Sequence, residues 1–340
     1  MFLGGNRMKK IAFVFLSLSV ILLSMYSYKL LNEISARNVY HEEDSTGKIS
    51  KTEGNNETEG EQVVDRKTKI IEDSDLEAVF DYFRRQKDHS LILVNKWNLL
   101  SENYQPTDIK DAAGIVPSTK EQMLLQKEAY EALITMFNGA KNEGIEGLFV
   151  VSGYRPYSYQ SQLYNAKVNA FSSQYDLETA KEKASEIVAI PGTSEHQTGL
   201  AIDFSSAKLL KTADPLVEEF KNTPQGEWLY NNSWKYGFVL RYLPEKKEIT
   251  GIISEPWHFR YVGIPHAQYM TLNHLCLEEY IEHVKEEKMV IFEDYFGNKY
   301  LIGFVQKENH DILLSEEFSL EKVMNVSEIG EEEYIITLKL

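Results

Sequence analysis

The stretch SEHQTGLAID, residues 194–203, decides the fold of the region around it. Its end alternates as a strand does, so Leu200 and Ile202 point to one face and Asp203 to the other. A carboxylate inside an apolar strand needs a partner, because burying an unpaired charge is costly. Two interpretations stay open: a zinc ion with His196 as co-ligand, or an ion pair of Asp203 beside an unrelated loop histidine.

A second stretch, EPWHFRYVG at 255–263, adds to the first interpretation. Its aromatic residues alternate as a core face, so His258 and Arg260 point the other way. His258 is a third candidate zinc ligand, since hydrolytic zinc sites use three protein ligands and keep a position for water. Glu255 precedes Pro256 at the strand entry, where it is placed to act as general base. The alternative is an aromatic core strand with an incidental Glu and His.

The third stretch, SGYRPYSYQ at 152–160, follows a short apolar strand, LFVV at 148–151. A loop residue directly after a strand and a glycine is a common place for a functional side chain, which here is Arg155. A fixed guanidinium stabilises an oxyanion or binds a carboxylate. The alternative is an ordinary surface arginine paired with an acidic neighbour.

Around these stretches the pattern mixes helices and strands without regular alternation, which indicates the α+β class. Ser118 and Glu121 form a capping box that predicts the start of a helix of roughly 18 residues. The other predicted helices cover 158–171, 177–188, 226–236 and 265–285, and the other strands 200–204, 238–242 and 257–262.

The chain after about residue 287 predicts a small β-rich C-terminal appendage, 287–340. Gly297-Asn298 separates two apolar runs, which is typical of a hairpin. The final run places Tyr334, Ile336, Leu338 and Leu340 on one face of a strand. Cys276, the single cysteine, lies in an apolar helical pattern and is predicted to be a small buried residue.

The N-terminus predicts a membrane anchor. Residues 11–28 are apolar and uncharged and follow Arg7, Lys9 and Lys10, so 1–10 is a cytoplasmic stub and the rest is exported. A cleaved signal peptide is the alternative. Residues 29–79 are polar and acidic and predict a flexible tether before a catalytic domain at 80–286.

The charge is uneven. The whole chain carries −16, which argues against a nucleic-acid partner. Residues 41–80 carry −7 and residues 281–340 carry −8, whereas residues 81–280 carry only −5. The acidity therefore belongs mainly to the two flanks.

Taken together, the three stretches resemble the VanY-type zinc D-alanyl-D-alanine carboxypeptidases. These are peptidoglycan peptidases, grouped with D-Ala-D-Ala dipeptidases and L,D-carboxypeptidases. The family pattern S-x-H-x-x-G-x-A-x-D is matched at 194–203, and the blocks SGYR at 152–155 and EPWH at 255–258 match its other signatures. The similarity covers roughly residues 90–285, and the flanks resemble VanY too.

The resemblance implies a Hedgehog/DD-peptidase-like fold with a mostly antiparallel sheet and flanking helices. It implies zinc bound by His196, Asp203 and His258, with Glu255 and Arg155 as catalytic residues. Arg155, Gln160 and Ser194 would contact the substrate, a peptidoglycan precursor or stem peptide ending in D-Ala-D-Ala.

The resemblance also implies a place at the bacterial cell membrane with the catalytic domain outside, and a contribution to vancomycin resistance. No obligate protein partner is predicted. An L,D-carboxypeptidase, a dipeptidase and a non-catalytic wall-binding domain stay open as alternatives. A serine penicillin-binding enzyme is disfavoured, because its K-T-G motif is missing and Lys211-Thr212-Ala213 is the nearest match.

Overall fold

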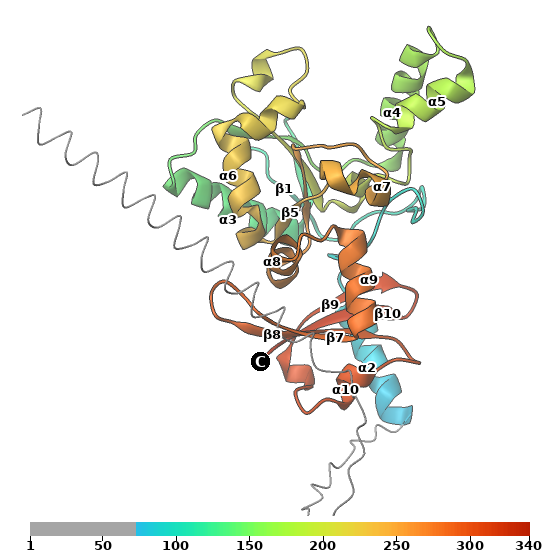
Figure 1. The fold of residues 1–340 in the computed structure, drawn as a ribbon, viewed down its shortest axis with the longest axis vertical. Helices are drawn as coiled ribbons and strands as arrows, with labels where there is room; N and C mark the ends of the chain where they lie inside the picture. The colour runs from blue at the N-terminus through green and yellow to red at the C-terminus, as the bar shows by residue number, and fades with distance from the viewer. Residues whose placement is uncertain (1–72) are drawn as a thin grey trace, which may run out of the picture. The chain divides into compact units, whose positions relative to one another are not determined.

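The computed structural model describes residues 73–340, which belong to one compact unit, Lys67–Leu340. The predicted stub at 1–10, the predicted membrane anchor at 11–28 and most of the predicted tether lie outside the described residues. Within 73–340 no helix is long and apolar enough to span a membrane. The described chain mixes helices with antiparallel sheets, as the α+β prediction requires (Figure 1).

The first four-stranded sheet has the order β3-β4-β6-β5 and is antiparallel throughout. Its strands are β3 (Leu148–Ser152), β4 (Ala201–Ser206), β6 (His258–Tyr261) and β5 (Phe238–Leu240). All four lie where the sequence predicted strands, with ends that differ by up to two residues. Each of the three motif stretches therefore contributes to, or adjoins, one of three neighbouring strands.

One face of this sheet is apolar and packs against helices α3 (Lys127–Asn142) and α6 (Pro224–Asn232). Phe204 and Phe259 from neighbouring strands meet edge to face, with ring centroids 5.6 Å apart. The predicted alternation is thus confirmed, because the apolar residues of β4 and β6 face the core and the polar ones face away. The predicted helix near 226–236 is α6 followed by the 3₁₀ helix η4 (Ser233–Tyr236).

The predicted capping box at Ser118 is wrong. Helix α3 begins only at Lys127, because residues before it form β2 (Leu124–Gln126), which pairs with β1 (Ile109–Asp111). The Ser118 hydroxyl donates to the carbonyl of Lys120 instead of capping a helix. Strand pairing has overridden a local helix signal here.

Two further helices follow β3, namely α4 (Tyr157–Phe171) and α5 (Leu177–Ser185), close to their predicted ranges. They pack on each other through a small cluster of their own, and Figure 1 draws them as a pair. The Asp176 carboxylate caps α5 by accepting from the backbone N–H groups of Glu178 and Thr179. The short elements are η1 (Glu195–Thr198), η2 (Leu209–Lys211), η3 (Glu218–Asn222), η5 (Pro244–Lys246), α7 (Lys247–Thr250), α10 (Asp311–Leu314) and η6 (Leu320–Lys322).

The single helix predicted at 265–285 is two helices, α8 (Ile264–Leu272) and α9 (Leu277–Glu287). His274 between them has a positive φ of 53°, which an α-helix cannot accommodate. Helix α9 has its own capping box, in which Glu279 accepts from the backbone N–H of Cys276. The Cys276 side chain is buried, as predicted.

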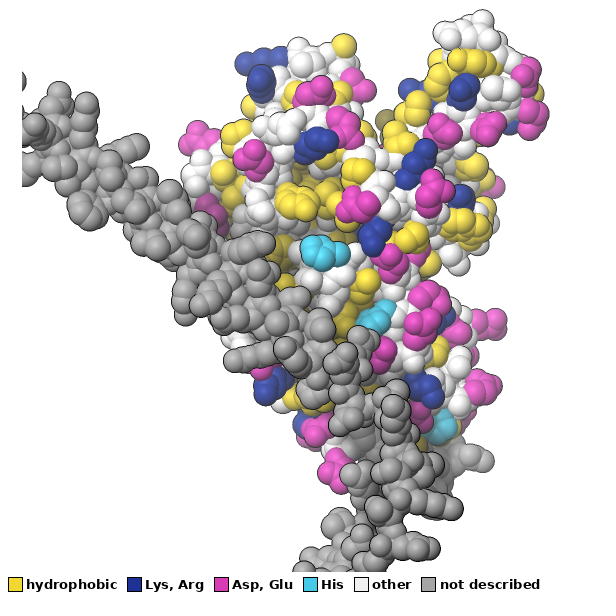
Figure 2. All heavy atoms as spheres, in the orientation of Figure 1, with side chains coloured by type: hydrophobic (Ala, Val, Ile, Leu, Met, Phe, Trp, Pro, Cys, Tyr) yellow, Lys and Arg dark blue, Asp and Glu magenta, His cyan; other side chains and the backbone are white. Residues whose placement is uncertain are grey.

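The second four-stranded sheet, formed by the C-terminal residues, has the order β7-β8-β10-β9. Its strands are β7 (Met289–Glu293), β8 (Lys299–Val305), β10 (Glu333–Lys339) and β9 (Val323–Gly330). The predicted hairpin is confirmed by the antiparallel pairing of β7 with β8. Figure 2 shows acidic side chains around this part of the molecule, in keeping with the net charge of the segment.

Both faces of the C-terminal sheet are covered. Tyr334, Ile336 and Leu338 pack against helix α2 (Asp73–Gln86), while Ile335 on the other face joins the core formed with α8 and α9. Leu340, predicted on the same face, lies beyond the strand and is 39% exposed. Helix α2 begins at Asp73, inside the stretch predicted as a tether (29–79). The last residues of that stretch therefore belong to a packed core.

Candidate metal centre

The polar face of the first sheet brings the three predicted ligands together. Asp203 in β4 is paired with Ser152 on one side and His258 on the other. His196 comes from η1, directly before β4. One donor atom from each of His196, Asp203 and His258 lies within 4.8 Å of the other two, and all three side chains are buried. The strand register thus assembles from distant segments the cluster that the spacing predicted.

The orientation of His196 is fixed by its backbone surroundings. The short helix η1 ends at Gly199, which has a φ of 73°, a conformation that glycine adopts without strain. The ring Nδ1 of His196 lies 2.7 Å from the carbonyl oxygen of Gly153, so it carries the proton and donates. The other nitrogen, Nε2, is buried without a well-formed hydrogen bond and lies 3.1 Å from Oδ2 of Asp203.

This donor set fits a zinc ion. Two imidazole nitrogens and one carboxylate oxygen are ligands that zinc accepts in hydrolytic sites. A buried ring nitrogen without a partner is costly unless something binds it. The hydrogen bond to Gly153 is the kind of outer contact that fixes the tautomer of a metal-binding histidine.

The electrostatics of the cluster favour the metal-binding forms of two ligands. Burial, together with the nearby Arg155, lowers the pKa of His196 to about 4, so its ring is neutral. Burial alone would raise the pKa of Asp203, but His196 and His258 outweigh it and hold that pKa well below its usual value. Asp203 is therefore a carboxylate over the whole physiological range.

His258 behaves differently. Burial alone would lower its pKa, but hydrogen bonds to Asp203 and Glu195 outweigh burial and raise the pKa to about 9. Its Nδ1 lies 3.0 Å from Oδ1 of Asp203 and its Nε2 3.4 Å from Oε2 of Glu195. A proton and a metal ion therefore compete for this ring.

Glu255 lies at the edge of the cluster. Its Oε2 is 3.7 Å from Nδ1 of His258, and its side chain is 15% exposed. A turn holds it, in which the His258 N–H donates to the Glu255 carbonyl. Burial raises the pKa of Glu255 to about 7, above its usual range despite the opposing effect of His258. A carboxyl group with such a pKa is suited to accept and return a proton near neutral pH.

Arg155 also lies beside the cluster, as the sequence predicted. Its backbone N–H donates to the carbonyl of His196, and its Nη2 is 3.6 Å from Oδ2 of Asp203. The side chain is 17% exposed, and its buried Nε has no hydrogen-bond partner. The guanidinium can therefore bind an anionic or carbonyl oxygen that enters the site.

Comparison with known proteins places the chain in a family. The family model described as "VanY: D-alanyl-D-alanine carboxypeptidase" matches residues 122–264. The putative carboxypeptidase YodJ of Bacillus subtilis (strain 168) is 38% identical over 252 residues, which are 70% of this chain and 88% of that protein. The chain belongs to the VanY family of D-alanyl-D-alanine carboxypeptidases. It is thus a peptidase.

Two further members of this group are similar over most of their own length. The bifunctional D-Ala-D-Ala dipeptidase and D-Ala-D-Ala carboxypeptidase VanXYC of Enterococcus gallinarum is 34% identical, over 58% of this chain and 96% of that protein. The solved structure of the vancomycin resistance D,D-dipeptidase VanXYg with a D-Ala-D-Ala phosphinate analog has a TM-score of 0.60 and 27% identity. That match covers 74% of this chain and 94% of that one.

Two predicted substrate contacts of the VanY pattern are also buried. Gln160 on α4 donates from Nε2 to the carbonyl of Ala189 at 2.7 Å, and its Oε1 has no hydrogen-bond partner. Ser194 is the residue before η1 and is 5% exposed. Ser194 is the first residue of the motif at 194–203, and the role of both residues in substrate binding stays a prediction.

Sequence reasoning missed two charged residues of this VanY site. Burial and the charge of Arg155 lower the pKa of Lys120, and its Nζ is 5.6 Å from the ring centroid of Tyr159. Its loop had been interpreted as a helix start. Glu195 stands at a variable position of the motif and is fully buried beside His258. A charged residue inside an otherwise buried motif was the available signal.

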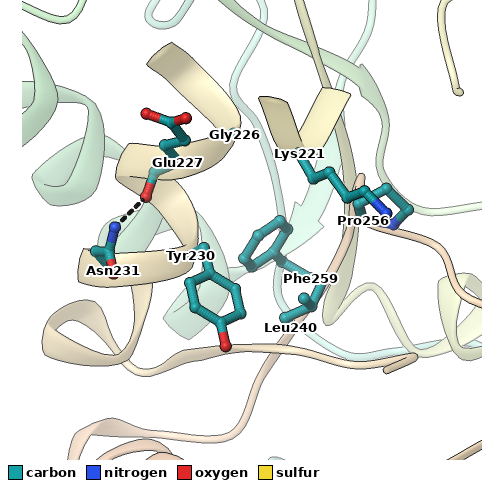
Figure 3. A pocket seen from close by; sticks show the side chains of 8 residues that line it. All are labelled: Lys221, Gly226, Glu227, Tyr230, Asn231, Leu240, Pro256 and Phe259. Atoms are coloured by element: carbon teal, nitrogen blue, oxygen red, sulfur yellow. Dashed lines mark hydrogen bonds between the residues drawn. The ribbon is translucent and has the colours of Figure 1, made fainter. Parts of the chain in front are cut away.

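The cavity in Figure 3, with a volume of about 100 Å³, is separate from the VanY metal cluster. Phe259 lines it and points to the face of β6 opposite His258. It is lined by Lys221, Gly226, Glu227, Tyr230, Asn231, Leu240, Pro256 and Phe259.

Proposed function

We propose that this chain is a zinc-dependent D,D-carboxypeptidase that removes the terminal D-Ala from peptidoglycan stem peptides ending in D-Ala-D-Ala. The observation that carries the proposal is the cluster of His196, Asp203 and His258, whose donor atoms lie within 4.8 Å of one another. Glu255 and Arg155 lie directly beside this cluster. The family relationship supports the same reaction class.

His196 Nε2, an Asp203 oxygen and His258 Nδ1 would hold the zinc ion. When bound, zinc polarises the peptide carbonyl and lowers the pKa of water, so that hydrolysis proceeds at neutral pH. Asp203 contributes one negative charge, which leaves the ion with net positive charge facing the substrate.

Glu255 would move the proton. Its carboxylate accepts a proton from the attacking water as the new C–O bond forms at the carbonyl carbon of the penultimate D-Ala. The same proton then passes to the nitrogen of the departing D-Ala as the C–N bond breaks. Arg155 donates hydrogen bonds to the carbonyl oxygen as negative charge develops, or to the substrate carboxylate.

Two alternatives share these residues and differ in the substrate. The bifunctional name of VanXYC favours testing a D-Ala-D-Ala dipeptidase activity beside the carboxypeptidase one. An L,D-carboxypeptidase acting on tetrapeptides is the other alternative. Gln160, Ser194 and Lys120 are the residues that we would vary to map specificity.

We also propose that residues 11–28 anchor the enzyme in the bacterial cell membrane with its catalytic domain outside, where stem peptides are found. The support is the apolar, uncharged run that follows three basic residues. Loss of D-Ala-D-Ala ends would then contribute to vancomycin resistance. Fractionation of the full chain and of a chain lacking 1–28 tests the anchor, and drug susceptibility of cells expressing each tests the contribution to resistance.

The deciding experiment measures D-Ala release from a UDP-linked pentapeptide, a tetrapeptide and the D-Ala-D-Ala dipeptide. We expect release from the pentapeptide, abolished by a chelator, restored by zinc and unaffected by penicillin. The Glu255→Ala chain is the matched inactive control. No release from the pentapeptide by the zinc-loaded chain would refute the proposal, and release from only one of the other peptides would establish the corresponding alternative.

A further inference from the structure

Glu195 is a carboxylate enclosed by cations. It lies in η1, is 1% exposed, and has Arg241 and Arg260 on the same oxygen. Arg241 Nε and Arg260 Nη1 each donate to Oε1 of Glu195 at 2.8 Å. Two hydrogen bonds from buried guanidinium groups thus hold the Oε1 end of this carboxylate.

The second oxygen of Glu195 is directed at the metal cluster. Oε2 lies 3.4 Å from Nε2 of His258, while both arginine contacts use Oε1. The opposite nitrogen of the same ring, Nδ1, faces Oδ1 of Asp203 and Oε2 of Glu255. The two ring nitrogens of His258 are therefore divided between Glu195 and the cluster.

The arginines that hold Glu195 are themselves fixed. Arg241 donates two hydrogen bonds to Glu278 of α9, at 2.7 and 2.8 Å, and Asn95 donates to the same carboxylate. Arg260 donates from Nη2 to the backbone carbonyls of Ser90 and Ile92. A carboxylate bound by two immobile guanidinium groups has little freedom to rotate away from His258.

We propose that Glu195 is a positioning residue, which holds the His258 ring with its proton on Nε2 and so presents Nδ1 to the metal ion. The inference rests on the proposed function, because it assumes that His258 is a zinc ligand. A histidine that binds a metal through one nitrogen commonly donates its other N–H to a carboxylate, which sets ring orientation and basicity. The structure supplies that carboxylate from a variable position of the motif, between Ser194 and His196.

The test compares zinc affinity in Glu195→Gln and Glu278→Gln chains by competition with a chelator. Glu195→Gln keeps the size of the side chain and removes its charge, and we expect roughly 10- to 100-fold weaker zinc binding. Glu278→Gln removes the other carboxylate from Arg241 but leaves Arg260 on Glu195, so we expect a change of less than about threefold. The absorption spectrum of the cobalt-substituted chain should change only in Glu195→Gln, since only there does the environment of a ligand change.

Further variants and readouts separate positioning from folding. Thermal melting of both variants shows whether they are folded, and Glu195→Asp, which keeps the buried charge but withdraws it from His258, serves if Glu195→Gln does not fold. Wild-type zinc affinity and an unchanged cobalt spectrum in the folded Glu195 variant would overturn the inference while leaving the proposed function standing. If the wild-type chain itself binds no zinc, the proposed function fails and the inference fails with it.

Discussion

The two four-stranded sheets of this molecule differ in the kind of side chain that their second face carries. Both are antiparallel, and both pack one face against helices. On the C-terminal sheet the second face is apolar too, and α2 covers it with Phe80 and Phe83. On the first sheet the second face presents Asp203, His258 and Arg260, all buried.

The difference shows how a buried polar face contributes to stability compared with an apolar one. Apolar faces contribute to stability in proportion to the area they bury. Buried charges contribute only when they are paired, and here two arginines pair with Glu195 and His258 pairs with Asp203. The C-terminal sheet thus buries apolar side chains on both faces, whereas the first sheet buries charged and polar side chains on one of its faces. Four variants, one or more on each sheet, test this contrast.

The largest effect is expected from Glu255→Ala on the polar face. Loss of the general base should lower kcat by up to about 10⁴-fold, or about 5.5 kcal/mol of transition-state stabilisation. Zinc content and melting temperature should stay near the wild-type values, because Glu255 is not one of the clustered ligands. Release of D-Ala measures the effect, with Glu248→Ala, an exposed carboxylate on α7, as the control. A Glu255→Ala chain with substantial activity would contradict the assigned role.

The next largest effect is expected from Phe80→Ala on the apolar face. Phe80 is fully buried, with its ring centroid 6.0 Å from that of Tyr334. Removing the ring should lower the free energy of unfolding by about 3–5 kcal/mol. Denaturant titration measures this loss, and Met324→Ala, an exposed side chain on β9, should change little. Turnover per folded molecule should persist at low temperature; its loss there would mean that the two sheets do not have separate tasks.

A smaller effect concerns acid stability of the C-terminal core. His266 is buried between Tyr280 and Thr337, and burial lowers its pKa to about 3. Near pH 6.5 this histidine can therefore be protonated only in the unfolded chain. Its contribution to the free energy of unfolding is constant above pH 6.5 and falls as the pH drops towards 3. As the pH falls below 6.5 this group should lower the unfolding free energy, with a slope that approaches about 1.4 kcal/mol per pH unit near pH 5.

Unfolding titrations of wild type and His266→Gln at pH 7 and pH 5 measure that slope. The variant should lose the part of the pH dependence due to His266, although it is less stable at pH 7. His274→Asn, at an exposed position, serves as control and should keep the wild-type slope. Equal slopes in wild type and His266→Gln would show that His266 does not resist protonation in the folded chain.

The smallest effect is expected from Thr337→Val in the same core. The Thr337 hydroxyl lies 3.2 Å from Nε2 of His266, and both residues are buried. Valine has nearly the same shape but cannot hydrogen-bond, so the free energy of unfolding should fall by about 1 kcal/mol. Thermal melting at pH 7 measures it. A change above that of Phe80→Ala would mean that polar contacts dominate this sheet as well.

The candidate ligands could be singled out because strand alternation acts within each short stretch of sequence. His196 and Asp203 are seven residues apart in one motif, and strand alternation alone places Asp203 and His258 away from the core. The sequence could not reveal the role of Glu195, because its partners Arg241 and Arg260 are 46 and 65 residues away. Which charges neutralise one another depends on strand order, and strand order is a long-range property.

Two predictions about the fold, the capping box at Ser118 and the end of the tether, differ from the structure. Ser118 and Glu121 are a plausible capping box, but the pairing of β1 with β2 occupies the following residues. Helix α2 lies in part inside an acidic stretch, yet Leu76, Phe80 and Phe83 recur at helical spacing, which was a usable signal. In the first case the pairing of two nearby strands decided the outcome, and in the second the helix packs against strands of the C-terminal sheet.

The contact of α2 with β10 joins the first described helix to the last strand. Phe80 and Phe83 meet Tyr334, and Arg84 pairs with Glu332. A premature stop that deletes residues 287–340 would therefore do more than shorten the protein. It would expose Phe80 and Phe83 of α2 and the apolar face of α9 to solvent. Exposed apolar surface of this kind favours binding by chaperones and cleavage by proteases. Residues 287–340 therefore complete the apolar cores that α2 and α9 pack into.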